Sequence, residues 1–487
     1  MKYIVVIILF FFSLSAAKAE IYKSLAKALK NLLKVDSLDL SFQRLEKFPQ
    51  EIFLCKNLRY LNLEFNQLIS LPAEIGNLVK LTSLNLSSNQ LTSLPAEIGN
   101  LVNLTSLDLR SNQLTSIPAE IGNLVNLTNL GLNSNQLTSL PPQIANLVNL
   151  KELWLGFNQL RSLPAQIGNL VNLTNLGLNS NQLTNIPPQI GNLVNLTNLV
   201  LNSNQLRNIP PQIWNLVNLT KLELGNNQLT ILAPQIANLV NLKLLFLGNN
   251  QLTSLPSEIG NLVKLTSLYL SHNQLTSIPS EIGNLVKLTS LNLGNNQLTN
   301  IPPRIWNLLN LTNLVLNSNQ LTNIPPQIGN LINLKELWLG FNPLTSLPFE
   351  ITKLKNCEID FQHDATKLWI APSLLYALKK NNCKVGGYSN PLASWCAQYF
   401  WNQNERFIYQ VDVAVKNESQ YFLKNIWVNI IVKDSKGNQQ YKKNHGININ
   451  LNAGEQQNYE VELTSPIYYF KQDPNNYKIE VEITDAQ

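Results

Sequence analysis

The sequence predicts an α/β solenoid followed by a small all-β sandwich, and three observations carry this prediction. An eleven-residue motif recurs every 23 residues through most of the 487-residue chain. Hydrophobic residues make up 44% of the sequence and charged residues only 14%, which is typical of chains that fold. From Phe407 onward the apolar pattern changes to alternation, as in half-buried strands. We therefore expect a long repeat array and a separate β domain.

Residues 1–19 have the features of a signal peptide. Lys2 gives a positive start, a strongly apolar stretch extends from Ile4 to Leu14, and Ala17-Lys18-Ala19 has the small-x-small pattern of a cleavage site. This stretch is shorter than the roughly 20 residues that span a bilayer as a helix. We expect cleavage after Ala19, no transmembrane segment in the mature chain, and a secreted, periplasmic or cell-surface protein.

Residues 20–34 predict an N-terminal capping helix, because a solenoid exposes its first core unless it is capped. Four leucines (Leu25, Leu29, Leu32 and Leu33) fall on one side of this helix and four lysines fall elsewhere. A basic helix that binds a membrane is the alternative interpretation. The position directly before the first repeat favours the cap.

Residues 35–357 predict the solenoid, with about 14 repeats. The motif Leu-x-x-Leu-x-Leu-x-x-Asn-x-Leu first begins at Leu58 and occurs thirteen times with every leucine and asparagine in place, after a degenerate copy that begins at Val35. Alternation around the central leucines predicts one short strand per repeat in a parallel sheet on the concave side. The Leu-Pro or Ile-Pro that follows, as in Ile117-Pro118, predicts helical or 3-10 turns on the convex side.

The asparagine column lies where the chain must turn out of each strand. Its amide groups can satisfy backbone groups that a turning chain leaves unpaired, so we expect a buried structural ladder. The ladder comprises Asn66, Asn89, Asn112, Asn135, Asn158, Asn181, Asn204, Asn227, Asn250, Asn273, Asn296, Asn319 and Asn342.

This pattern resembles that of leucine-rich-repeat proteins, over about 320 residues. The rest of each unit, as in Thr92-Ser93-Leu94-Pro95-Ala96-Glu97-Ile98-Gly99-Asn100-Leu101, is similar to the 23-residue class found in many exported bacterial proteins. The overall plan of signal, solenoid and β module resembles the internalins. The resemblance implies a curved solenoid that holds another macromolecule.

After the repeats, residues 358–400 predict a C-terminal cap and linker, with a helix from about Pro372 to Asn381. Residues 401–487 predict five or six short strands in an antiparallel sandwich, from alternating runs such as Tyr409-Val411-Val413-Val415. The string from Val413 to Glu455 resembles bacterial Ig-like modules.

The sequence contains no constellation that indicates catalysis. Its three histidines (His272, His363 and His445) lie in different regions without metal-ligand spacing, and phosphate-loop, dinucleotide and nucleophile-elbow motifs are missing. We expect no enzyme activity, no metal and no cofactor. The formal charge of +6 is small for this length, which argues against a nucleic-acid partner.

Four cysteines divide into two groups. Cys55 takes a leucine column and should be a small buried apolar residue, roughly 65 Å along the array from the others, so it should stay a free thiol. Among the other three, Cys383 with Cys396 closes a short loop and is the favoured disulfide. Cys357 with either of them is the alternative.

The outward residues of the concave sheet carry the functional information. Polar residues occupy this column in the first repeats, and large aromatic residues occur later, where interfaces favour such anchors. The hypothesised partner-binding residues are Trp154, Phe157, Phe246, Tyr269, Trp338 and Phe341. The competing explanation is that scattered exposed apolar residues are common on protein surfaces.

These observations favour a secreted or cell-surface scaffold that binds a macromolecular partner on its concave face, including a role in host interaction or adhesion. Protein is the expected partner class, because a long sheet offers wide area rather than a small pocket. Two alternatives stay open: a glycan-binding protein of the cell envelope, and a structural envelope protein without a dedicated ligand.

Overall fold

The computed structural model describes residues 21–361, 372–386, 395–402, 407–416, 423–434, 439–451, 456–467 and 477–486. The chain divides into two compact units, residues 1–219 and 220–487. The predicted signal peptide lies outside the described residues. Within the described residues, no helix has the length and apolar character needed to cross a membrane.

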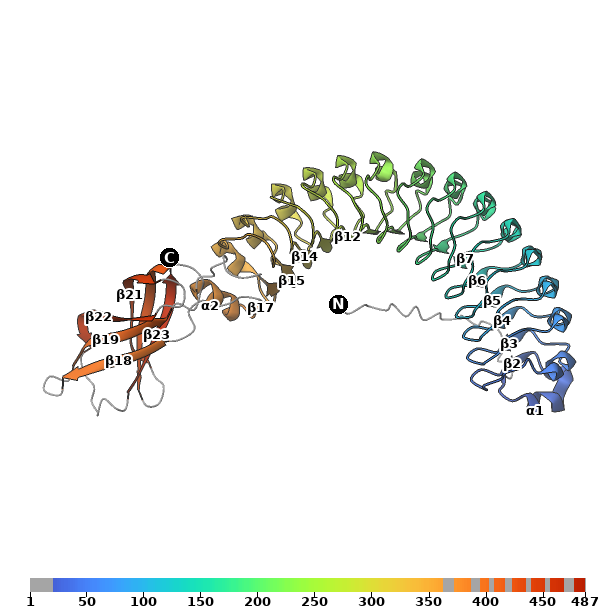
Figure 1. Ribbon diagram of the computed structural model, residues 1–487, viewed down its shortest axis with the longest axis horizontal. Coiled ribbons are helices and arrows are strands. Elements are labelled where there is room, and N and C mark those ends of the chain that lie inside the picture. Colours follow the sequence, from blue (N-terminus) through green and yellow to red (C-terminus); the bar gives the residue numbers. More distant parts are fainter. Residues whose placement is uncertain are drawn as a thin grey trace. The chain divides into compact units, whose positions relative to one another are not determined.

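In the first unit, each repeat supplies a three-residue strand and a five-residue 3-10 turn, and neighbouring strands pair in parallel with a shift of one repeat. Leu130 thus lies opposite Leu153. Figure 1 shows the labelled strands of this unit along the inner side of the curve and the helical turns along the outer side. The strands are β1 (Ile21–Tyr22), β2 (Ser37–Asp39), β3 (Tyr60–Asn62), β4 (Ser83–Asn85), β5 (Ser106–Asp108), β6 (Asn129–Gly131), β7 (Glu152–Trp154), β8 (Asn175–Gly177) and β9 (Asn198–Val200). The helices are α1 (Leu25–Ala28), η1 (Leu29–Lys34), η2 (Gln50–Leu54), η3 (Ala73–Asn77), η4 (Ala96–Asn100), η5 (Ala119–Asn123), η6 (Pro142–Asn146), η7 (Ala165–Asn169), η8 (Pro188–Asn192) and η9 (Pro211–Asn215).

The core of each repeat lies between its strand and its 3-10 turn. In the repeat that contains β7, Leu153, Leu155 and Ile167 are fully buried. Pro164 precedes η7 with φ −64°, the angle that its ring imposes, and so starts the turn. Neighbouring turns approach closely, since a Cβ on Gly99 would lie 2.5 Å from the Glu120 carbonyl oxygen. The glycine at this position therefore permits the close approach of the next turn.

The N-terminal segment differs from the single helix that the sequence predicts. β1 pairs in parallel with β2, α1 has only four residues, and the following η1 contains a non-helical residue at Asn31. Leu33 is 86% exposed, and Ala28 is the buried residue of the two short helices. The amphipathic pattern fails as a guide here because β1 extends the sheet by one strand and the helical backbone is interrupted at Asn31.

The second unit continues the same architecture. Its parallel strands are β10 (Lys221–Glu223), β11 (Leu244–Phe246), β12 (Ser267–Tyr269), β13 (Ser290–Asn292), β14 (Asn313–Val315), β15 (Glu336–Trp338), β16 (Glu358–Asp360) and β17 (Lys384–Gly386). Its helices are η10 (Pro234–Asn238), η11 (Ser257–Asn261), η12 (Ser280–Asn284), η13 (Pro303–Asn307), η14 (Pro326–Asn330), η15 (Phe349–Lys353) and α2 (Pro372–Lys380). The parallel ladder continues beyond residue 357, because the fully buried Ile359 and Phe361 take the places of leucines. The predicted solenoid of parallel strands and 3-10 turns is confirmed in each unit.

The C-terminal strands form two antiparallel sheets of three strands each. One has the order β18 (Trp395–Asn402), β19 (Phe407–Lys416), β22 (Gln456–Ile467), and the other β21 (Gln439–Leu451), β20 (Leu423–Asp434), β23 (Tyr477–Ala486). The Ig-like character of this region stays a prediction.

The asparagines of the repeat column are each at most 8% exposed and link successive turns of backbone. Asn158 Nδ2 donates to the carbonyl oxygens of Leu132 and Leu155, each at 3.0 Å, and the Leu137 N–H donates to Asn158 Oδ1 at 3.0 Å. Asn273 repeats this pattern in the second unit, with Leu247, Leu270 and Leu252. Each amide thus pairs backbone groups of two neighbouring repeats in a buried site.

Candidate partner-binding face

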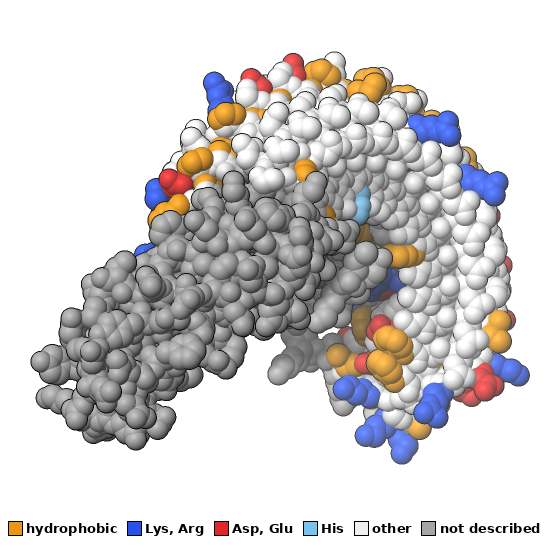
Figure 2. Space-filling view, turned by 60° about the vertical axis from the view of Figure 1, so that its left-hand side comes forward, with side chains coloured by type: hydrophobic (Ala, Val, Ile, Leu, Met, Phe, Trp, Pro, Cys, Tyr) orange, Lys and Arg blue, Asp and Glu red, His pale blue; other side chains and the backbone are white. Residues whose placement is uncertain are grey.

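We call the outward-facing residues of the parallel strands, together with the residue just before each ladder asparagine, the strand face. Figure 2 shows that backbone and uncharged polar side chains cover most of the strand face visible in that view, whereas most charged side chains lie near its edges. The 3-10 turns lie on the opposite side of each repeat and leave this face uncovered. The aromatic residues that interrupt this polar surface are therefore the candidates for specific contacts.

In the first unit, Trp154 on β7 lies flat against the neighbouring strand. A Cβ on Gly177 would be 2.4 Å from Trp154 Cε3, so the indole ring occupies the space that a side chain at that position would need. Trp154 Nε1 donates to Glu152 Oε2 at 3.2 Å. The ring is half-buried and is held by Gly177 and Glu152. A ring that is fixed in this way loses little freedom when a partner covers it.

Phe157, three residues after Trp154, is 58% exposed and has φ 56°. This column of the repeat always adopts the left-handed region, and Ser or Asn fills it in most copies. A bulky residue is disfavoured there, at a cost of about 1–3 kcal/mol, and exposure of its ring adds a further cost. Neither packing nor backbone conformation accounts for Phe157, which makes it a candidate contact residue.

In the second unit, Phe246 and Tyr269 lie side by side on β11 and β12. Their ring centroids are 5.6 Å apart with an interplanar angle of 48°, and the Phe246 ring covers Gly225, where a Cβ would lie 2.0 Å from Cε1. Both side chains are half-buried. The structure thus joins two predicted residues into one aromatic pair.

Trp338 and Phe341 repeat the Trp-Leu-Gly-Phe segment of the first unit. Each is 38% exposed, and Phe341 has φ 54°. Trp338 lies opposite Asp360 of β16, so a carboxylate replaces the glycine that Trp154 covers. This tryptophan accordingly has a more polar neighbour than Trp154.

The sequence analysis missed an aromatic pair at the N-terminal end of the strand face. Phe42 and Phe65 stack with ring centroids 4.6 Å apart at 14°, and they are 68% and 48% exposed. Both have positive φ, as Phe157 does. The signal was present in the column of Ser and Asn residues, in which Phe is the exception.

Two ion pairs on the described strand face lie within single repeats. Arg110 Nε donates to Asp108 Oδ1 at 2.8 Å, two strands before Trp154, and this hydrogen bond raises the pKa of the Arg110 guanidinium. Lys221 pairs with Glu223 in the second unit. Trp154 and Trp338, by contrast, each have a carboxylate nearby, from Glu152 and Asp360.

The described residues contain no group of His, Cys, Asp and Glu side chains arranged to hold a metal ion. Cys55, Cys357 and Cys383 are buried and form no disulfide with one another, and burial raises the pKa of the Cys357 thiol to about 12. Lys384 N–H donates to the Cys357 carbonyl oxygen, so Cys357 and Cys383 precede adjacent paired strands. The Cys396 side chain lies outside the described residues, and its bridge to Cys383 stays a prediction.

Comparison with known families covers nearly the whole array. The chain matches a family described as leucine-rich repeat region over residues 13–138 and 73–164, one described as leucine-rich repeat over 171–229 and 218–275, and one described as leucine-rich repeats (2 copies) over 263–305 and 309–356. A search of curated protein sequences gave no match.

Solved structures show the same architecture. A leucine-rich-repeat protein of Leptospira interrogans is 41% identical with a TM-score of 0.65, covering 75% of this chain and 99% of that one. An internalin of Listeria monocytogenes is 28% identical with a TM-score of 0.54, covering 69% and 89%. The ectodomain of the Arabidopsis receptor kinase HAESA, solved with an IDA peptide hormone ligand, is 27% identical with a TM-score of 0.55, covering 72% and 70%.

Proposed function

Since the chain belongs to the leucine-rich-repeat family, we propose that it is an exported scaffold that binds a protein partner on the strand face. The proposed contacts are Trp154 and Phe157 in the first unit, and Phe246, Tyr269, Trp338 and Phe341 in the second. The observation that carries this proposal is Phe157, which is 58% exposed at a backbone position that disfavours it. Contact with water does not offset the cost of Phe at this backbone angle, whereas a partner that covers the ring does.

The similar structures support this proposal. The HAESA ectodomain was solved with a peptide hormone, so an array of this architecture holds a peptide in that protein. The internalin and the receptor ectodomain also support an extracellular location, together with the apolar stretch and cleavage pattern of residues 1–19. N-terminal sequencing of the exported protein should start at Glu20.

The test begins with a cross-linking pull-down, in which residues 20–487 capture proteins from host-surface and envelope fractions. Affinity for the captured protein is then compared between the unaltered chain and the double variant Trp154→Ser/Phe157→Ser. Loss of two aromatic anchors should cost about 2 kcal/mol or more, which is roughly 30-fold in affinity. The matched control is Val148→Ser/Val171→Ser, because those valines are 46% and 44% exposed outside the strand face.

Unchanged affinity of the aromatic variant, with folding intact by circular dichroism, would contradict the proposed face. A second variant, Phe246→Ser/Tyr269→Ser/Trp338→Ser, tests the second unit independently. Binding that survives proteolysis of the target and disappears after its deglycosylation would support the glycan alternative. Capture of no partner would favour a structural role.

A further inference from the structure

The N-terminal cap segment, residues 21–34, is the most one-sidedly charged part of the described chain. It contains four lysines and no acidic residue. Lys23, Lys27, Lys30 and Lys34 are all exposed, and the ion pairs of the described residues involve none of them. On the strand face, by contrast, Arg110 and Lys221 each pair with a carboxylate of the same repeat. The lysines of the cap segment are therefore available to an external anion.

The same segment exposes aliphatic side chains that a cap would be expected to bury. Leu33 is 86% exposed, Ile21 50% and Leu54 of the adjacent η2 55%. The Leu33 carbonyl oxygen accepts a hydrogen bond from Asn57 Nδ2 at 3.0 Å, while its side chain faces outward. Coverage of the first repeat does not explain this outward leucine.

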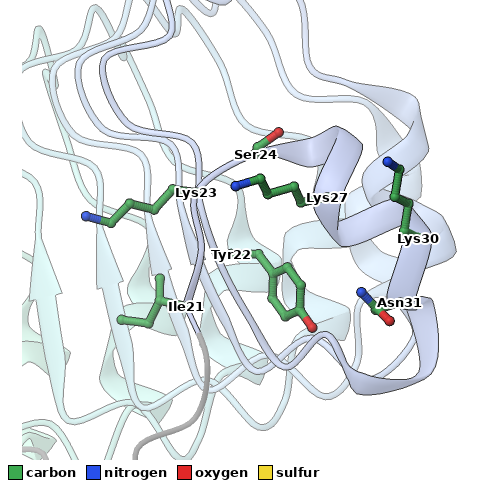
Figure 3. A pocket seen from close by; sticks show the side chains of 7 residues that line it. All are labelled: Ile21, Tyr22, Lys23, Ser24, Lys27, Lys30 and Asn31. Carbon is green, nitrogen blue, oxygen red and sulfur yellow. The ribbon is translucent and has the colours of Figure 1, made fainter.

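A pocket of about 460 Å³ opens in this segment, between β1 and the two short helices. In Figure 3, Lys27 and Asn31 lie beside Tyr22, Lys30 projects from the next turn, and Lys23 extends away from Tyr22, Asn31 and Lys30. Ile21, which is half exposed, lines the pocket together with the lysines. Cationic and aliphatic groups thus meet at one site, of a size that admits a phosphate-bearing headgroup.

We propose that the cap segment docks the protein on an anionic membrane surface. The lysines contact lipid phosphates, and Leu33 enters the boundary between headgroups and acyl chains. Peripheral binding of this kind needs both signals, since basic groups attract anionic lipid and apolar side chains anchor the contact. A soluble phosphate or a sulfated polysaccharide would use the lysines alone and would leave Leu33 unexplained. The inference is independent of the strand face.

The test measures sedimentation of residues 20–487 with vesicles of phosphatidylcholine, with and without phosphatidylglycerol. Residues 1–19 are omitted because their apolar stretch would itself enter a bilayer. Binding should require phosphatidylglycerol and should disappear when NaCl is raised from about 0.1 M to about 1 M, which shortens the Debye length to about 3 Å. The variant Lys23→Gln/Lys27→Gln/Lys30→Gln should bind about 100-fold more weakly, at roughly fivefold per lysine. Leu33→Ser should weaken binding about tenfold without a change of charge.

The matched control removes three exposed lysines elsewhere, as Lys287→Gln/Lys335→Gln/Lys355→Gln, and should bind as the unaltered chain does. Equal loss in this control would attribute binding to net charge and overturn the proposal. Absence of binding to phosphatidylglycerol vesicles would overturn it too. The proposal would also be overturned if heparin resin retained the chain through the three lysines while Leu33→Ser left vesicle binding unchanged.

Discussion

Asn158→Ala tests how successive repeats are held together. Asn158 is 8% exposed, and its side chain donates to the carbonyl oxygens of Leu132, Leu155 and Gly156 and accepts from the Leu137 N–H. Alanine removes both the amide donor and the amide acceptor. The Leu137 N–H then has no partner in a site that the neighbouring repeats keep closed, whereas the carbonyl oxygens of Leu132 and Leu155 still accept hydrogen bonds from Asn135 and Asn181.

The expected cost follows from the number of unpaired groups. A buried polar group that loses its partner costs about 1–3 kcal/mol, and water that enters the space left by the amide recovers part of this. With one N–H left unpaired, we expect a net loss of about 2 kcal/mol, which corresponds to roughly a 30-fold larger opening equilibrium around this repeat.

Hydrogen exchange measured residue by residue is the appropriate assay, because repeat arrays need not unfold in a single step. In Asn158→Ala the Leu137 amide should exchange roughly 30-fold faster, while the Leu68 amide, which Asn89 holds three repeats away, should change little. The control is Asn172→Ala, which removes one exposed hydrogen bond to the Val148 carbonyl oxygen at 2.9 Å. An acceleration of less than fivefold at Leu137, or one equal to that in the control, would refute a structural role for the ladder.

Three further predictions concern stability. Phe157→Asn should raise the melting temperature by a few degrees, because Asn tolerates φ 56° better than Phe and about 1 kcal/mol of strain is released. Partner binding should weaken in the same variant, and a lower melting temperature by calorimetry would contradict the prediction. Trp306→Ala should lower the free energy of unfolding by about 3–5 kcal/mol in urea titrations, since this tryptophan is 1% exposed. An unchanged urea midpoint would show that neighbouring side chains fill the space without cost. Burial raises the Cys357 pKa from 9.0 to about 12, so the neutral thiol stabilises the fold below pH 9.0 and this contribution is lost as pH rises from 9.0 towards 12. Alkaline destabilisation should be smaller in Cys357→Leu, and iodoacetamide at about pH 8 should label Cys357 by mass spectrometry only after denaturation.

The 23-residue period by itself determined the architecture of the array. Leucines at Leu153 and Leu155 point inward because side chains alternate along a strand, Pro164 fixes the start of a turn, and Asn158 supplies the amide that the turning backbone needs. These are local rules that repeat in every copy, so one correctly interpreted repeat predicts its neighbours. These rules did not predict β1 in the N-terminal segment, because this added strand depends on an open sheet edge rather than on the helical pattern of residues 20–34.

The candidate sites depended on the packing of neighbouring copies. The sequence singled out Trp154 and Phe246, but only the stacking of strands showed that each ring covers a glycine of an adjacent repeat and is thereby fixed. It did not indicate Phe42 and Phe65, because their significance lies in a backbone angle and in a ring contact across two repeats. Periodicity fixes which residues face inward, since burial follows from spacing along the chain. The residues that face outward are defined by contacts between repeats, and these exist only once the repeats are stacked.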